Sequence, residues 1–159
     1  MTREKPPAYE QAVRLLGARP HFRRELEQKL AARAYDDAEV ASALDRLAGA
    51  GYLDDVSAAR SFVAQRLSRG AEGKLKLKAE LDRRGASSAA VTAALAEIPE
   101  DDLEPAREAA VKWSRRGKSD PAALARHLAA KGFSRRAIGA AVKELGAETG
   151  REPDFDPDS

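Results

Sequence analysis

The sequence predicts an all-α protein made of three tandem three-helix repeats that form an elongated, curved helical array. Its composition points to helix, because alanine is abundant and runs of β-branched residues are nearly absent. One block of sequence also recurs three times without an internal gap, at offsets of 51 and then 47 residues. The alternative is a single compact helical bundle.

Each copy of the block predicts a helical hairpin. In the first copy, Leu26 and Leu30 are four residues apart and share one helix face. Val40, Leu44 and Leu47 follow the i, i+4, i+7 spacing of a second apolar face. Matching apolar residues recur in the other copies, and Ala43 has alanine counterparts that indicate close helix contact. The three copies are 25–47, 76–98 and 123–145.

The turn inside each hairpin has its own pattern. A small residue ends the first helix, and glycine there tolerates a left-handed backbone. Two residues later an aspartate or serine can cap the second helix by accepting from its free N–H groups. The small residues are Ala34, Gly85 and Gly132, and the capping residues are Asp36, Ser87 and Ser134.

A further helix is predicted before each hairpin, at about 8–18, 54–69 and 101–116, with breaks at Arg19, Gly70 and Gly117. One repeat of about 45 residues buries little core alone, so the repeats are expected to stack. The predicted organisation is an N-terminal tail at 1–7, repeats at 8–52, 53–99 and 100–146, and an acidic disordered tail at 147–159.

Composition excludes several classes of protein. The chain has no cysteine, so disulfides and thiol chemistry are absent. No apolar run approaches the roughly 20 residues of a membrane span, and the first residues contain no apolar signal segment. We therefore expect a cytoplasmic protein without a membrane partner.

The sequence contains no recognisable catalytic or cofactor motif. His21 and His127 are far apart and occupy different repeat columns, and no cluster has metal-ligand spacing. No phosphate-binding glycine loop and no nucleophile motif are found. The expectation is a non-enzyme that needs no cofactor and no metal.

The charge is unevenly distributed along the chain. The tail from 147 carries a net charge of −4, so the rest of the chain carries +6 within the total of +2. The segment 112–136 contains eight lysines and arginines, and Asp120 is its only acidic residue. Charge of one sign at this density favours an anionic partner, such as a phosphate backbone or an acidic protein surface.

The second repeat also has a basic stretch. Lys74, Lys76 and Lys78 occupy the predicted start of a helix, where cations oppose the macrodipole and do not stabilise the helix. The alternative is a solvated charged face. The candidates for contact with an acidic protein surface or with nucleic acid are Arg66, Arg69, Lys74, Lys76, Lys78, Lys112, Arg115, Arg116, Lys118, Lys131, Arg135 and Arg136.

For some basic and aromatic residues, a structural role is the preferred interpretation over binding. Arg33, Arg84 and Lys131 share a repeat column near helix ends, where a favourable interaction with the helix dipole is the preferred interpretation. Trp113 aligns with Leu15 of the first repeat and is predicted to pack in the core and not to stack on a base.

The segment Gly51-Tyr52-Leu53-Asp54-Asp55 holds two adjacent carboxylates that could suggest a metal or proton site. The repeat offset aligns the pair with Asp101 and Asp102, and both pairs open the first helix of a repeat. A carboxylate there accepts from backbone N–H groups and complements the dipole. We interpret the segment as a structural joint, at which Tyr52 and Leu53 pack between repeats.

This segment also carries a resemblance to a known family. Residues 51–55 match the Gly-Tyr-(Leu/Ile)-Asp-Asp signature of the RecX family, and the pattern continues through 66–86 into Glu-Leu-x-x-(Lys/Arg)-Gly. Segment 19–35 is similar to the family's first-repeat motif, and the resemblance covers about 8–145. Two departures are Ala58, where an aromatic is usual, and Phe22, where a small polar residue usually starts a helix.

The resemblance implies a regulator of the RecA recombinase in DNA repair, homologous recombination and the SOS response. Such a protein binds the RecA filament on single-stranded DNA, with double-stranded DNA a further candidate, and limits its ATPase, strand exchange and growth. We expect a monomer. The alternative function is a sequence-nonspecific DNA-binding protein that acts without a recombinase.

Overall fold

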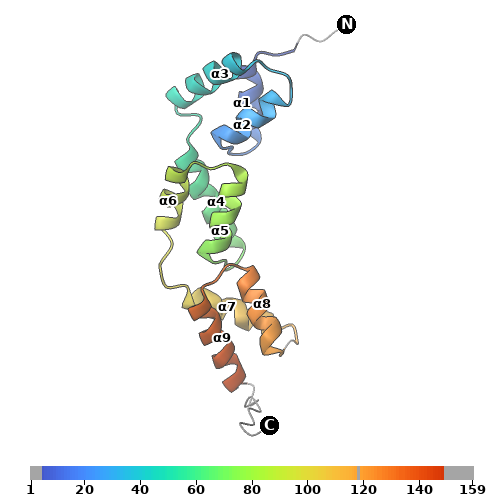
Figure 1. Ribbon diagram of the computed structural model, residues 1–159, viewed down its shortest axis with the longest axis vertical. Helices are drawn as coiled ribbons and strands as arrows, with labels where there is room; N and C mark the ends of the chain where they lie inside the picture. The colour runs from blue at the N-terminus through green and yellow to red at the C-terminus, as the bar shows by residue number, and fades with distance from the viewer. Residues whose placement is uncertain (1–4, 118, 149–159) are drawn as a thin grey trace. The chain divides into compact units, whose positions relative to one another are not determined.

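The computed structural model describes residues 5–117 and 119–148, and these residues form nine α-helices and no strand (Figure 1). The colours of Figure 1 follow the chain from α1 in blue to α9 in red. The helices are α1 (Ala8–Ala18), α2 (Arg23–Ala31), α3 (Asp37–Gly49), α4 (Asp55–Arg69), α5 (Lys74–Arg84), α6 (Ser88–Ala96), α7 (Leu103–Ser114), α8 (Pro121–Ala130) and α9 (Arg135–Glu148).

The predicted all-α class and the succession of three-helix repeats are confirmed. Every helix expected from the repeat pattern is present within a few residues of its expected bounds, and the breaks fall at or beside Arg19, Gly70 and Gly117. The exact division into repeats at 8–52, 53–99 and 100–146 stays a prediction. The expected disordered tail lies almost wholly outside the described residues.

The hairpin turns have the geometry that the repeat columns predict. Gly85 and Gly132 have φ angles of 83° and 81°, and Ala34 adopts the same left-handed region at 57°. The capping residues also act as expected. Asp36 accepts from the amides of Ala38 and Glu39, while the serines at 87 and 134 accept from the amides three residues later.

By their internal contacts the residues group into two compact units. The first unit comprises 1–64 and 79–97, and the second comprises 65–78 and 98–159, as far as these ranges are described. In the first unit, α3 packs against both α1 and α2. Leu26, Leu30, Leu44 and Leu47 are fully buried there, and burial of one such side chain stabilises the fold by roughly 1.5–3 kcal/mol.

The second unit has a core between α7, α8 and α9. Leu124, Leu128 and Phe133 are buried, with alanines filling the close contacts between helices. Trp113 is only 5% exposed, so its predicted place in the core is confirmed. Ala71, from the segment between α4 and α5, is partly buried and packs against this core.

Two glycines of the second unit face each other at very short range. The Gly73 amide donates to the carbonyl of Lys131 at 2.8 Å, next to the turn at Gly132. A Cβ on Gly73 would overlap the backbone of Gly132, and a Cβ on Gly132 would overlap the backbone of Lys76. Glycine is therefore required on both sides, which fixes the start of α5 against the turn between α8 and α9.

We expect Gly73→Ala to lower the free energy of unfolding by about 2 kcal/mol, because the added methyl meets backbone that has to shift. Urea denaturation followed by circular dichroism measures the change. The matched control is Gly139→Ala in α9, where the new Cβ meets open space. This control is expected to gain roughly 0.5–1 kcal/mol from helix propensity. Equal stability of the two variants would contradict the close contact.

Candidate functional site

All the basic binding candidates that the structure describes belong to the second unit. Those from the second repeat lie within 65–78, and this segment groups with 98–159 and not with the rest of its own repeat. The sequence placed them in two separate repeats, so their membership of one unit was not predicted. Lys118 lies outside the described residues.

Some of these candidates are paired with carboxylates. Arg66 donates to Glu72 through two nitrogens at 3.0 and 2.7 Å, and Lys76 donates to the same carboxylate at 3.1 Å. Lys74 pairs with Glu100 at 2.7 Å, across the second unit. Two carboxylates, Glu72 and Glu100, thus offset two of these three positive charges.

Four other candidates lie at the surface: Arg136, which has a carboxylate partner, and Lys78, Arg115 and Arg135. Arg136 donates to Asp101 at 2.7 Å, although its side chain is 71% exposed. Arg115 directly follows α7, Arg135 begins α9 and Lys78 lies in α5, and all three are exposed. The lysines of the stretch 74–78 do occupy the first turns of a helix, as predicted.

The remaining candidates surround a cavity of about 330 Å³ in the second unit. Arg69 comes from the end of α4, Lys112 and Arg116 from the end of α7, and Lys131 from the end of α8. Among the described residues of the lining, Glu108 is the only carboxylate, and Trp113 and His127 also contribute. The cavity thus brings together cations from three segments that are distant in sequence.

The residues of one repeat column have different partners. Arg33 donates to the carbonyl of Lys29 at 2.8 Å, at the end of its own helix, as the dipole interpretation predicts. Lys131 donates instead to the carbonyl of Ala71 at 3.2 Å. The Arg84 guanidinium lies over the rings of Phe22 and Phe62, at 5.2 and 5.0 Å from their centroids. The shared column therefore does not have one shared role.

The Asp54–Asp55 pair is a structural joint, and its two members cap different helices. Asp54 accepts from the amides of Val56 and Ser57 at 2.9 and 3.2 Å, and from the Ser57 hydroxyl at 2.7 Å. These hydrogen bonds hold the pKa of Asp54 below its usual range. Asp55 instead accepts from the amide of Arg23 at 2.8 Å, at the start of α2.

This second contact accounts for the departure at Phe22. A phenylalanine cannot accept a hydrogen bond at the start of α2, and its side chain is buried. The carboxylate of Asp55 supplies the missing acceptor from another helix, and Glu25 accepts from the Phe22 amide at 3.4 Å. Phe22 is thereby free to serve as a core residue.

The aligned pair in the second unit, Asp101 and Asp102, also binds the starts of two different helices. Asp101 accepts from the amide of Leu103 at 3.0 Å, at the start of α7. Asp102 accepts from both the amide and the hydroxyl of Ser134 at 2.6 Å, at the start of α9. In both pairs the first aspartate caps its own helix and the second binds the start of another.

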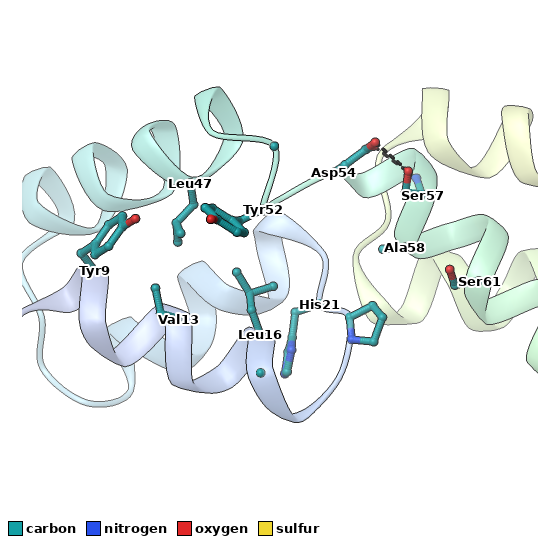
Figure 2. A pocket seen from close by; sticks show the side chains of 13 residues that line it. Tyr9, Val13, Leu16, His21, Leu47, Tyr52, Asp54, Ser57, Ala58 and Ser61 are labelled. Atoms are coloured by element: carbon teal, nitrogen blue, oxygen red, sulfur yellow. Dashed lines mark hydrogen bonds between the residues drawn. The ribbon is translucent and has the colours of Figure 1, made fainter.

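An apolar cavity of about 700 Å³ in the first unit was not predicted (Figure 2). Figure 2 shows Tyr9, Val13, Leu16 and Tyr52 gathered beside α1 and α3. Tyr52 lines the cavity but is 71% exposed, so the expectation that it packs at the joint was wrong, whereas Leu53 is buried. Sequence periodicity could not reveal the cavity, because its lining comes from loops as well as helices.

His21 lies at the edge of this cavity and is buried. Its Nδ1 donates to the carbonyl of Arg19 at 2.8 Å, since a carbonyl can only accept. Burial, more than any neighbouring charge, lowers the pKa of this imidazole. The residue is therefore neutral at pH 7 and serves the fold.

Within 5–117 and 119–148, no group of histidine, cysteine, aspartate or glutamate side chains could hold a metal ion. No helix among those residues is long and apolar enough to cross a membrane.

Comparison with known proteins places the chain in a family. Residues 8–47 match the model of the first three-helix domain of RecX. The regulatory protein RecX of Chromohalobacter salexigens is 39% identical over 135 residues, which cover 83% of this chain and 88% of that protein. This chain belongs to the RecX family. The RecX protein of Halorhodospira halophila is 37% identical over 148 residues, or 89% of this chain and 90% of the relative.

Solved RecX structures have the same fold. The crystal structure of RecX from Lactobacillus salivarius superposes with a TM-score of 0.76 over 88% of this chain and 95% of that one. A second RecX crystal structure gives 0.73 over 86% and 70%. Sequence identity to each is 22%, so these two similarities show the fold alone. The relatives bear the name of a regulatory protein, and this chain is accordingly a RecX-family regulator.

We expect Glu72→Gln to destabilise the protein by about 1 kcal/mol at pH 7, because Arg66 and Lys76 lose their shared carboxylate. Burial raises the pKa of Glu72, but the two cations outweigh it and the net pKa is lowered. The stabilisation is therefore present above the unfolded pKa near 4.5 and is lost as the pH falls through the folded value.

Urea denaturation of the wild type and the variant between pH 3 and pH 7 tests this prediction. The difference in unfolding free energy should shrink below about pH 4.5. Glu10→Gln, an exposed carboxylate of α1, is the control and should show little difference at any pH. A constant difference for Glu72→Gln across this range would contradict the ion-pair explanation.

Proposed function

We propose that this chain regulates the RecA recombinase by binding the RecA filament on single-stranded DNA. It limits the filament's ATP hydrolysis, strand exchange and growth in recombinational DNA repair. The observation that carries the proposal is the placement of all described basic candidates in one compact unit of a RecX-family chain. A filament of nucleic acid and protein presents the anionic surface that such a unit attracts.

The action needs binding and no chemistry. The protein acts as a monomer in the cytoplasm, and repeats at 8–52, 53–99 and 100–146 act as linked contact modules. Several linked modules convert weak individual contacts into tight overall binding, since each later contact is intramolecular. A protein held in this way on several protomers would oppose the changes that the filament undergoes during hydrolysis and growth.

The cations differ in what they offer to a partner. Arg66, Lys74 and Lys76 already have carboxylate partners within the second unit. Arg69, Lys112 and Arg116 have no ion pair among the described residues and are exposed. The proposed attraction to the filament therefore rests mainly on the second group, together with Arg115 and Arg135.

Filament binding is tested with preformed RecA filaments and bare single strands at about 150 mM salt, where weak electrostatic binding is screened. We expect the protein to prefer the filament and to slow DNA-dependent ATP hydrolysis. Fluorescence anisotropy measures the binding, and a coupled ATPase assay measures the rate. No binding to filaments together with unchanged ATPase, strand exchange and filament length would contradict the proposal.

The second candidate function is sequence-nonspecific DNA binding without a recombinase, which the basic second unit also favours. It requires equal affinity for filament-free DNA, a steep loss of that affinity with salt, and recombinase effects explained by competition for DNA. The comparison of filaments with bare strands separates the two functions.

A variant tests the basic surface of the last repeat. Replacement of Lys112, Arg115, Arg116 and Lys118 with alanine removes four positive charges, and we expect filament affinity to fall at least tenfold, since each lost phosphate contact costs about 1 kcal/mol or more. The ATPase titration gives the affinity. Unchanged filament binding would remove this surface from the proposed interface.

A further inference from the structure

The basic cavity of the second unit has features of a built site for an anion. Its cations come from the ends of α4, α7 and α8, so three separate segments converge on one space. Lys112 in the last turn of α7 and Arg116 in the turn that follows this helix both line the cavity. Arg69 and Lys131 add two further positive charges, and within the described part of the chain Glu108 is the one acid of the lining.

The positive charge of this cavity is not neutralised by ion pairs. Among 5–117 and 119–148, no carboxylate pairs with Arg69, Lys112 or Arg116. Lys131 donates to a neutral carbonyl, that of Ala71. Burial lowers the pKa of Lys131, and although Glu72 raises it, nearby cations lower it further. Four like charges held together in this way repel one another unless an anion joins them.

Helix dipoles reduce this charge without removing it. The cavity lies at the C-terminal ends of three helices, each equivalent to about −0.5 charge. With Glu108 they offset a little over half of the four positive charges. The helix dipoles explain why a cation is stable at each helix end. They do not explain why three helix ends lie at one cavity, or why this cavity keeps a net positive charge.

The walls of the cavity suit a ligand with an organic part. Trp113, Ala109 and His127 form its less polar side, and the rings of Trp113 and His127 lie 6.4 Å apart between centroids. The volume of about 330 Å³ falls at the small end of the range for ligand pockets, roughly 300–1,000 Å³. A phosphate with its attached sugar fits this size better than a long peptide.

We propose that this cavity is a binding site for a phosphate ester, held by Arg69, Lys112, Arg116 and Lys131. The ester comes from the backbone of single-stranded DNA or from a free nucleotide. Arginine and lysine bind phosphate oxygens through charge-assisted hydrogen bonds, and the apolar wall receives the sugar. The site deepens the proposed function, because it gives the basic unit one fixed point of contact with a strand.

The test compares two double variants of equal charge. The site variant is Lys112→Gln with Arg116→Gln. The matched control is Lys143→Gln with Arg14→Gln, which removes one exposed lysine and one exposed arginine from outside the cavity. Circular dichroism and thermal melting first establish that both variants fold like the wild type. A third variant, Arg69→Gln, tests the same cavity from a different helix.

Binding to a fluorescent oligothymidylate is measured by anisotropy between 50 and 200 mM salt, without any recombinase. We expect the site variant to bind about tenfold more weakly, with a salt slope that is smaller by roughly 1 per lost phosphate contact. The control variant should change the affinity and the salt slope less than the site variant does. Arg69→Gln should weaken binding, as the site variant does.

Calorimetry with ADP, and with inorganic phosphate, identifies the source of the ester. If ADP binds the wild type and not the site variant, while oligothymidylate binding is unaffected, the site takes a free nucleotide. If only oligothymidylate binding depends on the site, it takes a strand. Equal effects of the site and control variants on every probe would overturn the site, because total charge alone would then explain binding.

These outcomes are independent of the proposed regulation of RecA. All the probes are bound by the protein alone, so the site is established or overturned even if the chain has no effect on recombinase ATPase. Conversely, a site variant that loses phosphate binding but still slows the ATPase leaves the regulatory proposal intact.

Discussion

The fold depends on how its short helices satisfy the backbone N–H groups at their starts. Each α-helix leaves four such groups without an internal partner, and short helices therefore carry a high proportion of them. Side-chain carboxylates solve this problem at several positions. Asp54 and Asp101 cap the helices that they precede, while Asp55 and Asp102 reach α2 and α9. A pair of adjacent aspartates thus fixes both where one helix begins and which other helix lies beside it.

This use of acids shapes the electrostatics of the second unit. Asp101, Asp102 and Asp120 accept from helix-start amides, Asp101 and Asp120 also pair with Arg136 and Arg126, and Glu72 is shared by two cations. Among the residues that the structure describes, Glu108 is the one carboxylate beside the cations of the cavity. Stability and binding are connected in this way: the acids that organise the helices leave the basic side chains available to an anionic partner.

The family fold tolerates wide changes of sequence for a related reason. Solved RecX structures share only 22% of their residues with this chain, yet they superpose well. The requirements at each turn are few, namely an apolar face, a residue that accepts a left-handed backbone, and an oxygen that caps the next helix. Ala34 meets the second requirement without being glycine, and at Phe22 an oxygen from another helix meets the third.

The sequence by itself determined the helices, the hairpin turns, the core position of Trp113 and the family, because these follow from local spacing and from a repeated pattern. It also marked the basic candidates. Only the tertiary structure decided that Asp55 and Asp102 bind other helices, that Glu72 pairs with both Arg66 and Lys76, and that Arg69, Lys112, Arg116 and Lys131 line one cavity. These contacts join residues distant in the chain, and their distances depend on how helices pack, which local periodicity does not encode.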